Sequence, residues 1–137
     1  MRVLFICTGN SARSQIAEAL LRKVTKGAVE VHSAGSQPKS EIHPMAREAV
    51  QKLFDLDMKD QYPKTLDRFL GQEFDYVITV CDNANQNCPA FPGKTKRIHW
   101  SFDDPASVEG DDMAKLSVFR RVRDEIRGRL REFIETA

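Results

Sequence analysis

The sequence predicts a single α/β domain in which a parallel sheet is covered by helices. Short apolar runs rich in β-branched residues alternate with segments of helical periodicity, an order typical of β-α-β units. A length of 137 residues suits one domain with one core, so we assign residues 1–137 to it. With 41% hydrophobic and 30% charged residues, the composition is that of a soluble globular protein.

Four segments are predicted to be strands. Residues 3–6 form a short, wholly apolar run, as expected for a buried strand. Residues 29–33 alternate in polarity, and residues 76–80 are apolar and mostly β-branched. Residues 96–102 supply the fourth strand. Strands joined by helices within one sheet imply right-handed parallel crossovers, so the carboxyl ends of all four should meet at one edge.

Three amphipathic helices are predicted between and after these strands. Each carries one apolar stripe with charged residues on the opposite face. The first spans about residues 13–26 and ends at Gly27, the second begins at Pro44, and the third runs from Met113 to the C-terminus. The stripes consist of Ile16, Leu20 and Val24; of Ala46, Ala49, Val50, Leu53 and Phe54; and of Leu116, Phe119, Val122, Ile126, Leu130, Phe133 and Ile134.

Three shorter segments connect these elements. Thr65 is expected to cap a short helix that stops at Gly71. Residues 82–93 are polar and rich in Asn and Pro, which predicts a mobile loop or a marginal helix. Residues 106–112 are an acidic, glycine-containing loop.

The turn between the first strand and the first helix carries the clearest functional signal. A helix N-terminus offers unpaired N–H groups and partial positive charge, and so binds anions. Gly9 permits unusual backbone angles and Asn10 tolerates the left-handed region, so successive N–H groups can point inward. Arg13 can clamp two oxygens of a tetrahedral oxyanion, and Ser14 can donate to a thiolate at Cys7. The predicted binding residues are Thr8, Gly9, Asn10, Ser11, Ala12, Arg13 and Ser14.

This Cys-x5-Arg-Ser pattern resembles the phosphate-binding loop of protein tyrosine phosphatases. Its place near residue 1 resembles the low-molecular-weight branch, which includes the thioredoxin-coupled arsenate reductases. The resemblance implies a three-layer, flavodoxin-like domain with a four-stranded parallel sheet. Asp104, followed by Pro105, matches the Asp-Pro general acid of that branch. With Cys7 and Cys81, the Asp103–Asp104 pair should lie at the active edge of the sheet.

The other two cysteines strengthen the resemblance to the reductases. Cys81 and Cys88 have the Cys-x6-Cys spacing of the reductase redox pair. The similarity continues through His99–Trp100, residues 102–106 and residues 119–126, and so spans most of the chain. A phosphatase needs only the first cysteine, whereas a reductase must deliver two electrons and needs thiols that end as a disulfide.

The resemblance implies a relay of three thiols. Cys7 attacks arsenate held by the loop and Arg13, while Asp104 protonates the leaving oxygen. Cys81 then attacks Cys7, which releases arsenite and leaves a Cys7–Cys81 disulfide. Cys88 attacks Cys81, and reduced thioredoxin reduces the resulting Cys81–Cys88 disulfide. Phosphate and sulfate should compete with arsenate, because their geometry is similar.

Two positions in the loop region depart from the relatives. Ala106 follows the Asp-Pro pair where the phosphatases carry an aromatic residue that grips aryl substrates, which favours a reductase over a tyrosine phosphatase. Ala12 replaces a second loop cysteine found in many relatives. The relay does not use that thiol, so the chemistry of the loop should be retained.

The relay needs no cofactor, and we expect no bound metal. Some relatives bind potassium near the loop through groups that match Asn10, Glu18 and Ser33. A further carboxylate would fall near Lys64, and a lysine there should repel a cation. Glu18 itself is expected to be a solvated surface carboxylate.

The remaining histidines and the tryptophan are assigned structural roles. We expect His32 to be a strand residue with a hydrogen-bonded ring, and His99 and Trp100 to have packing roles.

Composition bounds the partners and the compartment. The formal net charge is +1, which argues for neither nucleic acid nor a membrane surface, and no stretch is long enough to span a bilayer. Three cysteines without secreted-scaffold spacing favour the reducing cytoplasm.

Three alternatives stay open beside the reductase. A low-molecular-weight protein tyrosine phosphatase, working through a phosphocysteine at Cys7, would explain the loop and Asp104 but not Cys81 and Cys88. A structural zinc module would use three Cys and one His, although Cys-x6-Cys is poor zinc spacing. A non-enzymatic oxyanion-binding module would leave both later cysteines without a role.

Overall fold

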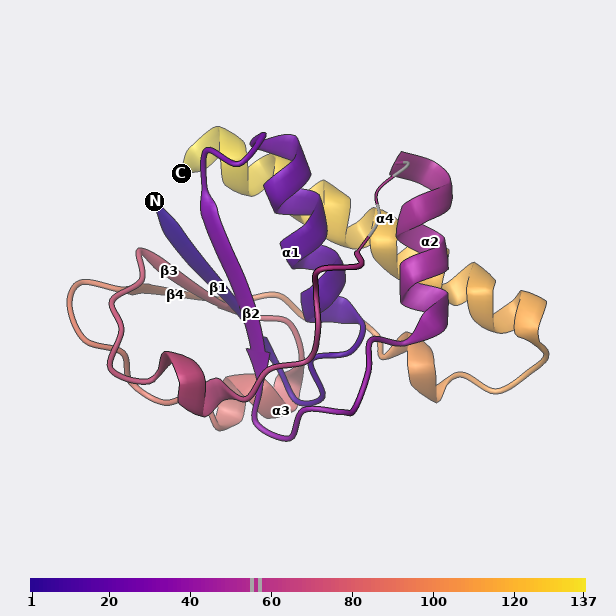
Figure 1. Cartoon of the computed structure of the whole chain (residues 1–137), viewed down its shortest axis with the longest axis horizontal. Helices are drawn as coiled ribbons and strands as arrows, with labels where there is room; N and C mark the ends of the chain where they lie inside the picture. The colour runs from indigo at the N-terminus through magenta and orange to yellow at the C-terminus, as the bar shows by residue number, and fades with distance from the viewer. Residues whose placement is uncertain (55, 57) are drawn as a thin grey trace.

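The computed structural model describes residues 1–54, 56 and 58–137, with residues 52–54 as helical backbone alone. The predicted stripe positions Leu53 and Phe54 therefore lie outside the described side chains. The elements follow in the order β1 (Arg2–Cys7), α1 (Arg13–Val24), β2 (Glu30–Gly35), α2 (Pro44–Phe54), the 3-10 helix η1 (Leu66–Phe69), β3 (Tyr76–Thr79), α3 (Asp82–Gln86), β4 (Lys96–His99), the 3-10 helix η2 (Pro105–Ser107) and α4 (Asp112–Thr136) (Figure 1).

The four strands form one parallel sheet, as predicted, and their order in it is β2-β1-β3-β4. Cys7 lies opposite Gly35, and Thr79 lies opposite both Ile6 on one side and His99 on the other. The carboxyl ends of the strands therefore meet at one edge, where the loops that follow them can build a common site.

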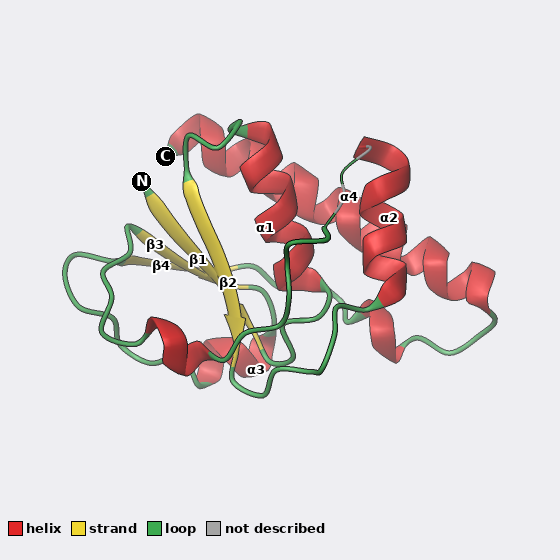
Figure 2. Ribbon diagram, viewed as in Figure 1, coloured by secondary structure: helices red, strands yellow, loops and turns green. Residues whose placement is uncertain are grey.

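Helices α1, α2 and α4 pack together beside one face of the sheet (Figure 2). The opposite face is covered by the shorter η1 and by aromatic side chains from the loops. His32 on β2 stacks against Phe69 of η1 with ring centroids 5.2 Å apart, and Phe74 packs edge-on against Phe91 at 5.9 Å. The His32 ring is also hydrogen-bonded to the Glu30 carboxylate at 2.9 Å, which confirms its expected structural role.

The fourth strand is shorter than predicted because its neighbour β3 ends at Thr79, opposite His99. The Trp100 N–H still donates to the Thr79 carbonyl at 2.9 Å, but the regular strand ends at His99. The Trp100 ring lies 6.2 Å from the Phe5 ring and 6.1 Å from Phe133 of α4. Trp100 therefore has the packing role predicted for it. The role of His99 is polar instead, because both of its ring nitrogens have hydrogen-bond partners.

The last helix begins one residue before its predicted start, because Asp111 caps it. The Asp111 carboxylate accepts a hydrogen bond from the Ala114 N–H at 2.8 Å. The segment predicted as an acidic loop after residue 105 begins with η2, which the sequence interpretation missed. Among the described residues, none of the helices combines the length and apolar character needed to cross a membrane.

Candidate active site

The loop from Cys7 to Ser14 wraps around its cysteine sulfur. The Asn10 N–H donates to Cys7 Sγ at 3.2 Å, and Ser14 Oγ lies 3.0 Å from the same sulfur. Asn10 has φ 49°, the left-handed conformation predicted for it, whereas Gly9 does not have a positive φ. Helix α1 begins without a side-chain cap or an acidic residue in its first turn. Its positive N-terminal end is therefore available to bind an anion.

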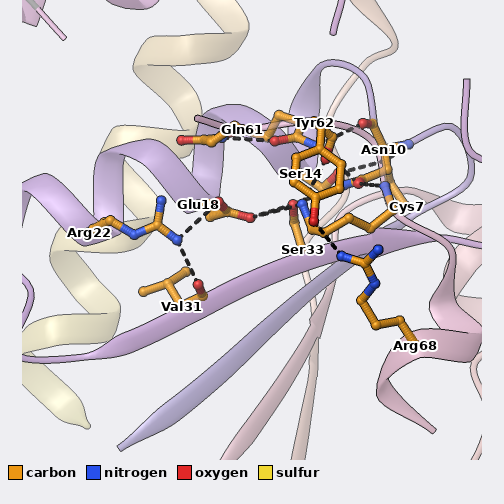
Figure 3. Close-up of polar contacts among 12 residues, drawn as sticks. Cys7, Asn10, Ser14, Glu18, Arg22, Val31, Ser33, Gln61, Tyr62 and Arg68 are labelled. Carbon is orange, nitrogen blue, oxygen red and sulfur yellow. Dashed lines mark hydrogen bonds and ion pairs between the residues drawn. The ribbon is translucent and has the colours of Figure 1, made fainter. Parts of the chain in front are cut away.

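The side-chain amide of Asn10 orients two hydroxyls. Its Nδ2 donates to Ser14 Oγ at 2.8 Å and to Ser33 Oγ at 3.0 Å (Figure 3). Its Oδ1 accepts from the Lys64 N–H at 2.8 Å, which fixes the orientation of the amide. Because Ser14 Oγ accepts from Asn10, the Ser14 hydroxyl hydrogen can point at Cys7. The Cys7 sulfur thus has two hydrogen-bond donors, the Asn10 N–H and the Ser14 hydroxyl.

Glu18 lies at the far end of this network and is buried, so its assignment to the surface is wrong. Only 4% of the residue is exposed. Its carboxylate accepts from Ser33 Oγ at 2.7 Å and pairs with Arg22 at 3.0 Å (Figure 3). The ammonium of Lys64 lies 3.7 Å from Glu18 Oε1, and its burial lowers the Lys64 pKa while Glu18 opposes that shift. Glu18 can be buried because Ser33, Arg22 and Lys64 compensate its charge.

A cavity of about 220 Å³ opens above the loop. It is lined by residues 7–13, by Gln37 and Lys39, and by Asp104 and Ala106. The cavity thus brings Cys7, Arg13 and Asp104 together although they lie up to 97 residues apart, as their places at strand ends predict. Sequence reasoning missed Gln37 and Lys39, because they belong to a polar loop without any motif.

The two neighbouring aspartates have different environments. Asp104 lines the cavity, and its Oδ1 accepts a hydrogen bond from the Ala106 N–H at 3.0 Å, which caps η2. Asp103 is instead paired with Arg121 of α4 at 3.0 Å. The backbone here also binds the loop, because Arg13 Nη1 donates to the Phe102 carbonyl at 3.0 Å. Of the two carboxylates, only Asp104 is placed to reach a ligand above Cys7.

Cys81 is joined to the loop through Thr8. The Thr8 hydroxyl lies 3.5 Å from Cys81 Sγ and accepts a hydrogen bond from the Asn83 side chain at 2.9 Å. Cys81 is buried and stands immediately before the five-residue helix α3. The segment after β3 thus starts as a marginal helix, one of the two predicted forms.

The segment between Cys81 and Cys88 is held by polar contacts. His99 bridges it to the sheet, because its ring nitrogens lie 3.0 Å from Asp82 Oδ1 and 2.8 Å from Thr79 Oγ1. Cys88 is half-buried, and burial raises the pKa of its thiol while Arg97 opposes the shift. All three cysteines are free thiols in this structure.

A family model described as low molecular weight phosphotyrosine protein phosphatase matches residues 2–137. The chain belongs to this family. Within it, the arsenate reductase of Halalkalibacterium halodurans is 44% identical over 134 residues, which cover 98% of this chain and 95% of the relative.

Solved structures of family members have the same fold. The thioredoxin-dependent arsenate reductase of Corynebacterium glutamicum is 39% identical, with a TM-score of 0.74. The match covers 98% of this chain and 60% of the C. glutamicum chain, so this chain spans less than two thirds of the length of that protein. A low molecular weight protein tyrosine phosphatase from T. tengcongensis, 24% identical, has a TM-score of 0.78 over 100% of this chain and 99% of its own. The latter likeness concerns the fold alone.

The zinc alternative has no geometric support in this family member. Within the described residues, no group of three or more His, Cys, Asp or Glu side chains is arranged to hold a metal ion. Cys7 faces the oxyanion cavity, and Cys88 Sγ has the Pro89 carbonyl at 3.5 Å as its hydrogen-bond partner.

Replacing Lys64 with methionine should destabilise the fold and the loop together. The change removes a cation next to buried Glu18, while Arg22 still pairs with that carboxylate. We therefore expect a loss of about 2 kcal/mol in the free energy of unfolding, measured by urea denaturation. Lys23→Met, on the exposed surface of α1, is the matched control and should change stability by less than about 0.5 kcal/mol. Equal losses in both variants would show that the Glu18–Lys64 pair has no special role.

Proposed function

We propose that this protein reduces arsenate to arsenite through its three cysteines, with electrons from thioredoxin. One observation carries the proposal: Cys81 Sγ lies 3.5 Å from the hydroxyl of Thr8, the residue next to Cys7. A phosphatase of this fold needs the loop and Asp104 but no second thiol beside them. The arsenate reductases among its relatives support the same assignment.

The first step forms a bond between Cys7 sulfur and arsenic. The loop N–H groups and Arg13 hold the oxyanion above the Cys7 thiolate, which attacks arsenic. Asp104, in the wall of the same cavity, gives its proton to the departing oxygen, which leaves as water. Ser14 and the Asn10 N–H hold the sulfur in place for this attack.

The second step transfers two electrons to arsenic. The Cys81 thiolate attacks Cys7 sulfur, the electron pair of the sulfur–arsenic bond goes to arsenic, and As(V) becomes As(III), which leaves as arsenite. Thr8 and the start of α3 hold the Cys81 sulfur beside the loop for this attack. The product is a Cys7–Cys81 disulfide.

The third step restores Cys7. Cys88 attacks Cys81, and Cys7 leaves as a thiolate. In the reduced structure Cys88 is half-buried, and burial raises the pKa of its thiol. We therefore expect the segment 82–93 to rearrange when this thiol attacks Cys81. That segment is held mainly by exposed polar contacts such as Asp82–His99, which open at low cost. The dithiol of thioredoxin then reduces the Cys81–Cys88 disulfide, and the cycle fits the reducing cytoplasm.

Disulfide mapping after a single turnover tests this proposal. The reduced protein receives one equivalent of arsenate, and its disulfides are identified by mass spectrometry. The intact protein should release arsenite and form a Cys81–Cys88 bridge. Cys88→Ala should stop at Cys7–Cys81, and Cys81→Ser should form no bridge by this route. Thioredoxin, its reductase and NADPH should support repeated turnover of the intact protein alone.

The same experiment separates the reductase from a phosphatase. The loop, Arg13 and Asp104 suffice for some hydrolysis of an aryl phosphate, so weak phosphatase activity fits both assignments. Efficient hydrolysis that survives Cys81→Ser and Cys88→Ala, together with three free thiols after exposure to arsenate, would establish the phosphatase and refute the reductase.

A further inference from the structure

The segment that follows β2 forms a second wall of the oxyanion cavity. The Gln37 N–H donates to the Thr8 carbonyl at 2.9 Å, and the Lys39 N–H donates to the Gly9 carbonyl at 2.9 Å. These two backbone hydrogen bonds fasten residues 37–39 alongside the loop. Gln37 and Lys39 both line the cavity as a result.

The stem of Lys39 lies along the loop. A Cβ atom built on Gly9 would be 3.3 Å from Lys39 Cγ and 3.3 Å from Cε, closer than most packed carbons. A glycine at this position therefore leaves room for the Lys39 methylenes, since it is not needed for a positive φ. The Lys39 stem thus runs close to Gly9 at the cavity wall, while the residue as a whole is exposed to solvent.

The electrostatic surroundings agree with this position of the ammonium. The pKa of His43, which follows the same segment, is lowered chiefly by burial and secondly by the charge of Lys39, while Asp104 acts in the opposite direction. The His43 N–H donates to the Ser11 carbonyl at 2.8 Å, so His43 is itself attached to the loop. Lys39 and Asp104 therefore both lie close enough to His43 to shift its pKa, in opposite directions.

The charges of the cavity wall fit a small dianion. The wall carries two cations, Arg13 and Lys39, and one carboxyl group, Asp104, which must be protonated to act as an acid. Within the described part of the chain, no aromatic side chain lines the cavity, so an aryl group would find no stacking partner. A second cation strengthens the binding of a ligand that carries two negative charges.

We propose that Lys39 is a second cationic binding residue of the loop and fits the site to doubly charged inorganic oxyanions. Arg13 holds the oxyanion from the helix side, and Lys39 holds it from the segment after β2. The inference rests on the proposed oxyanion chemistry of the loop. Phosphate binding tests it without any reduction, because phosphate has the same geometry and cannot complete the relay.

Lys39→Met tests the charge while retaining a stem that can pack over Gly9. Phosphate affinity of the reduced protein is measured by titration calorimetry at low and at high ionic strength. We expect Kd to rise about 5-fold at an ionic strength near 50 mM, and less than about 2-fold near 1 M, where salt screens the ammonium. Lys39→Arg should keep the affinity within about 2-fold, because it retains the charge. In arsenate reduction, the loss should appear in KM rather than in kcat.

Lys94→Met is the matched control. Lys94 is exposed and lies near Arg2 and Asp75, at the amino ends of the strands. Its replacement should leave phosphate Kd unchanged at both ionic strengths. An unchanged Kd in Lys39→Met, or an equal rise in both variants, would overturn the inference. If phosphate binding depends on Lys39 but arsenate is not reduced, the proposed function fails and the inference stands.

Discussion

Cys7→Ser is expected to abolish arsenate reduction and leave oxyanion binding. The substitution removes the nucleophile but keeps the loop N–H groups, Arg13 and the hydroxyl of Ser14 in place. We expect kcat to fall by at least about 10⁴-fold, because a serine hydroxyl without a base is a poor nucleophile. Phosphate Kd, measured by calorimetry, should stay within a few-fold of the wild-type value.

Arg13→Ala is the matched comparison for this prediction. It removes the guanidinium from the cavity and from the Phe102 carbonyl, and should weaken phosphate binding as well as turnover. Persistent arsenite release from Cys7→Ser would show that another thiol starts the reaction. Loss of phosphate binding in Cys7→Ser would show instead that the loop had collapsed, which unfolding curves of both variants would reveal.

Asp104→Asn should slow the first chemical step by roughly 100-fold or more, since an amide cannot supply the proton to the leaving oxygen. The measurement is single-turnover arsenite release from the reduced protein. Asparagine can still accept the Ala106 N–H hydrogen bond that caps η2, so the fold should be retained.

Asp103→Asn is the control for Asp104, because it removes the same charge one residue away. Asp103 is paired with Arg121 on the exposed side of α4. An exposed ion pair of this kind contributes little to stability, so the rate should change less than about 2-fold. A large effect of Asp103→Asn with none for Asp104→Asn would show that Asp103, and not Asp104, is the general acid.

The order of strands and helices, the loop and the candidate thiols could all be predicted from the sequence. Apolar runs and helical stripes are local patterns, and they identified β1, β3, α1 and α4 because each element must bury its own apolar face. The parallel topology then placed Cys7, Cys81 and the aspartate pair at one edge, because parallel strands share their carboxyl ends.

The choice between similar residues needed the tertiary structure. The sequence shows two adjacent aspartates, and only the fold brings Asp103 to Arg121 and Asp104 to the cavity. Glu18 occupies a helical position that looks solvated, yet β2 and the segment around Lys64 enclose it. Whether a charged side chain is buried depends on partners that are distant in the sequence, and the spacing of apolar residues along a helix does not reveal those partners.

The contacts that define the chemistry are also long-range. Thr8 and Cys81 are 73 residues apart, and their hydrogen bond exists because β1 and β3 are neighbours in the sheet. Lys39 lies in a loop without a motif and reaches the cavity because its backbone bonds Gly9. The sequence by itself determined the reacting groups, because the chemistry dictates their residue types. The tertiary structure alone decided which polar side chains surround them, because packing across the edge of the sheet brings those side chains together.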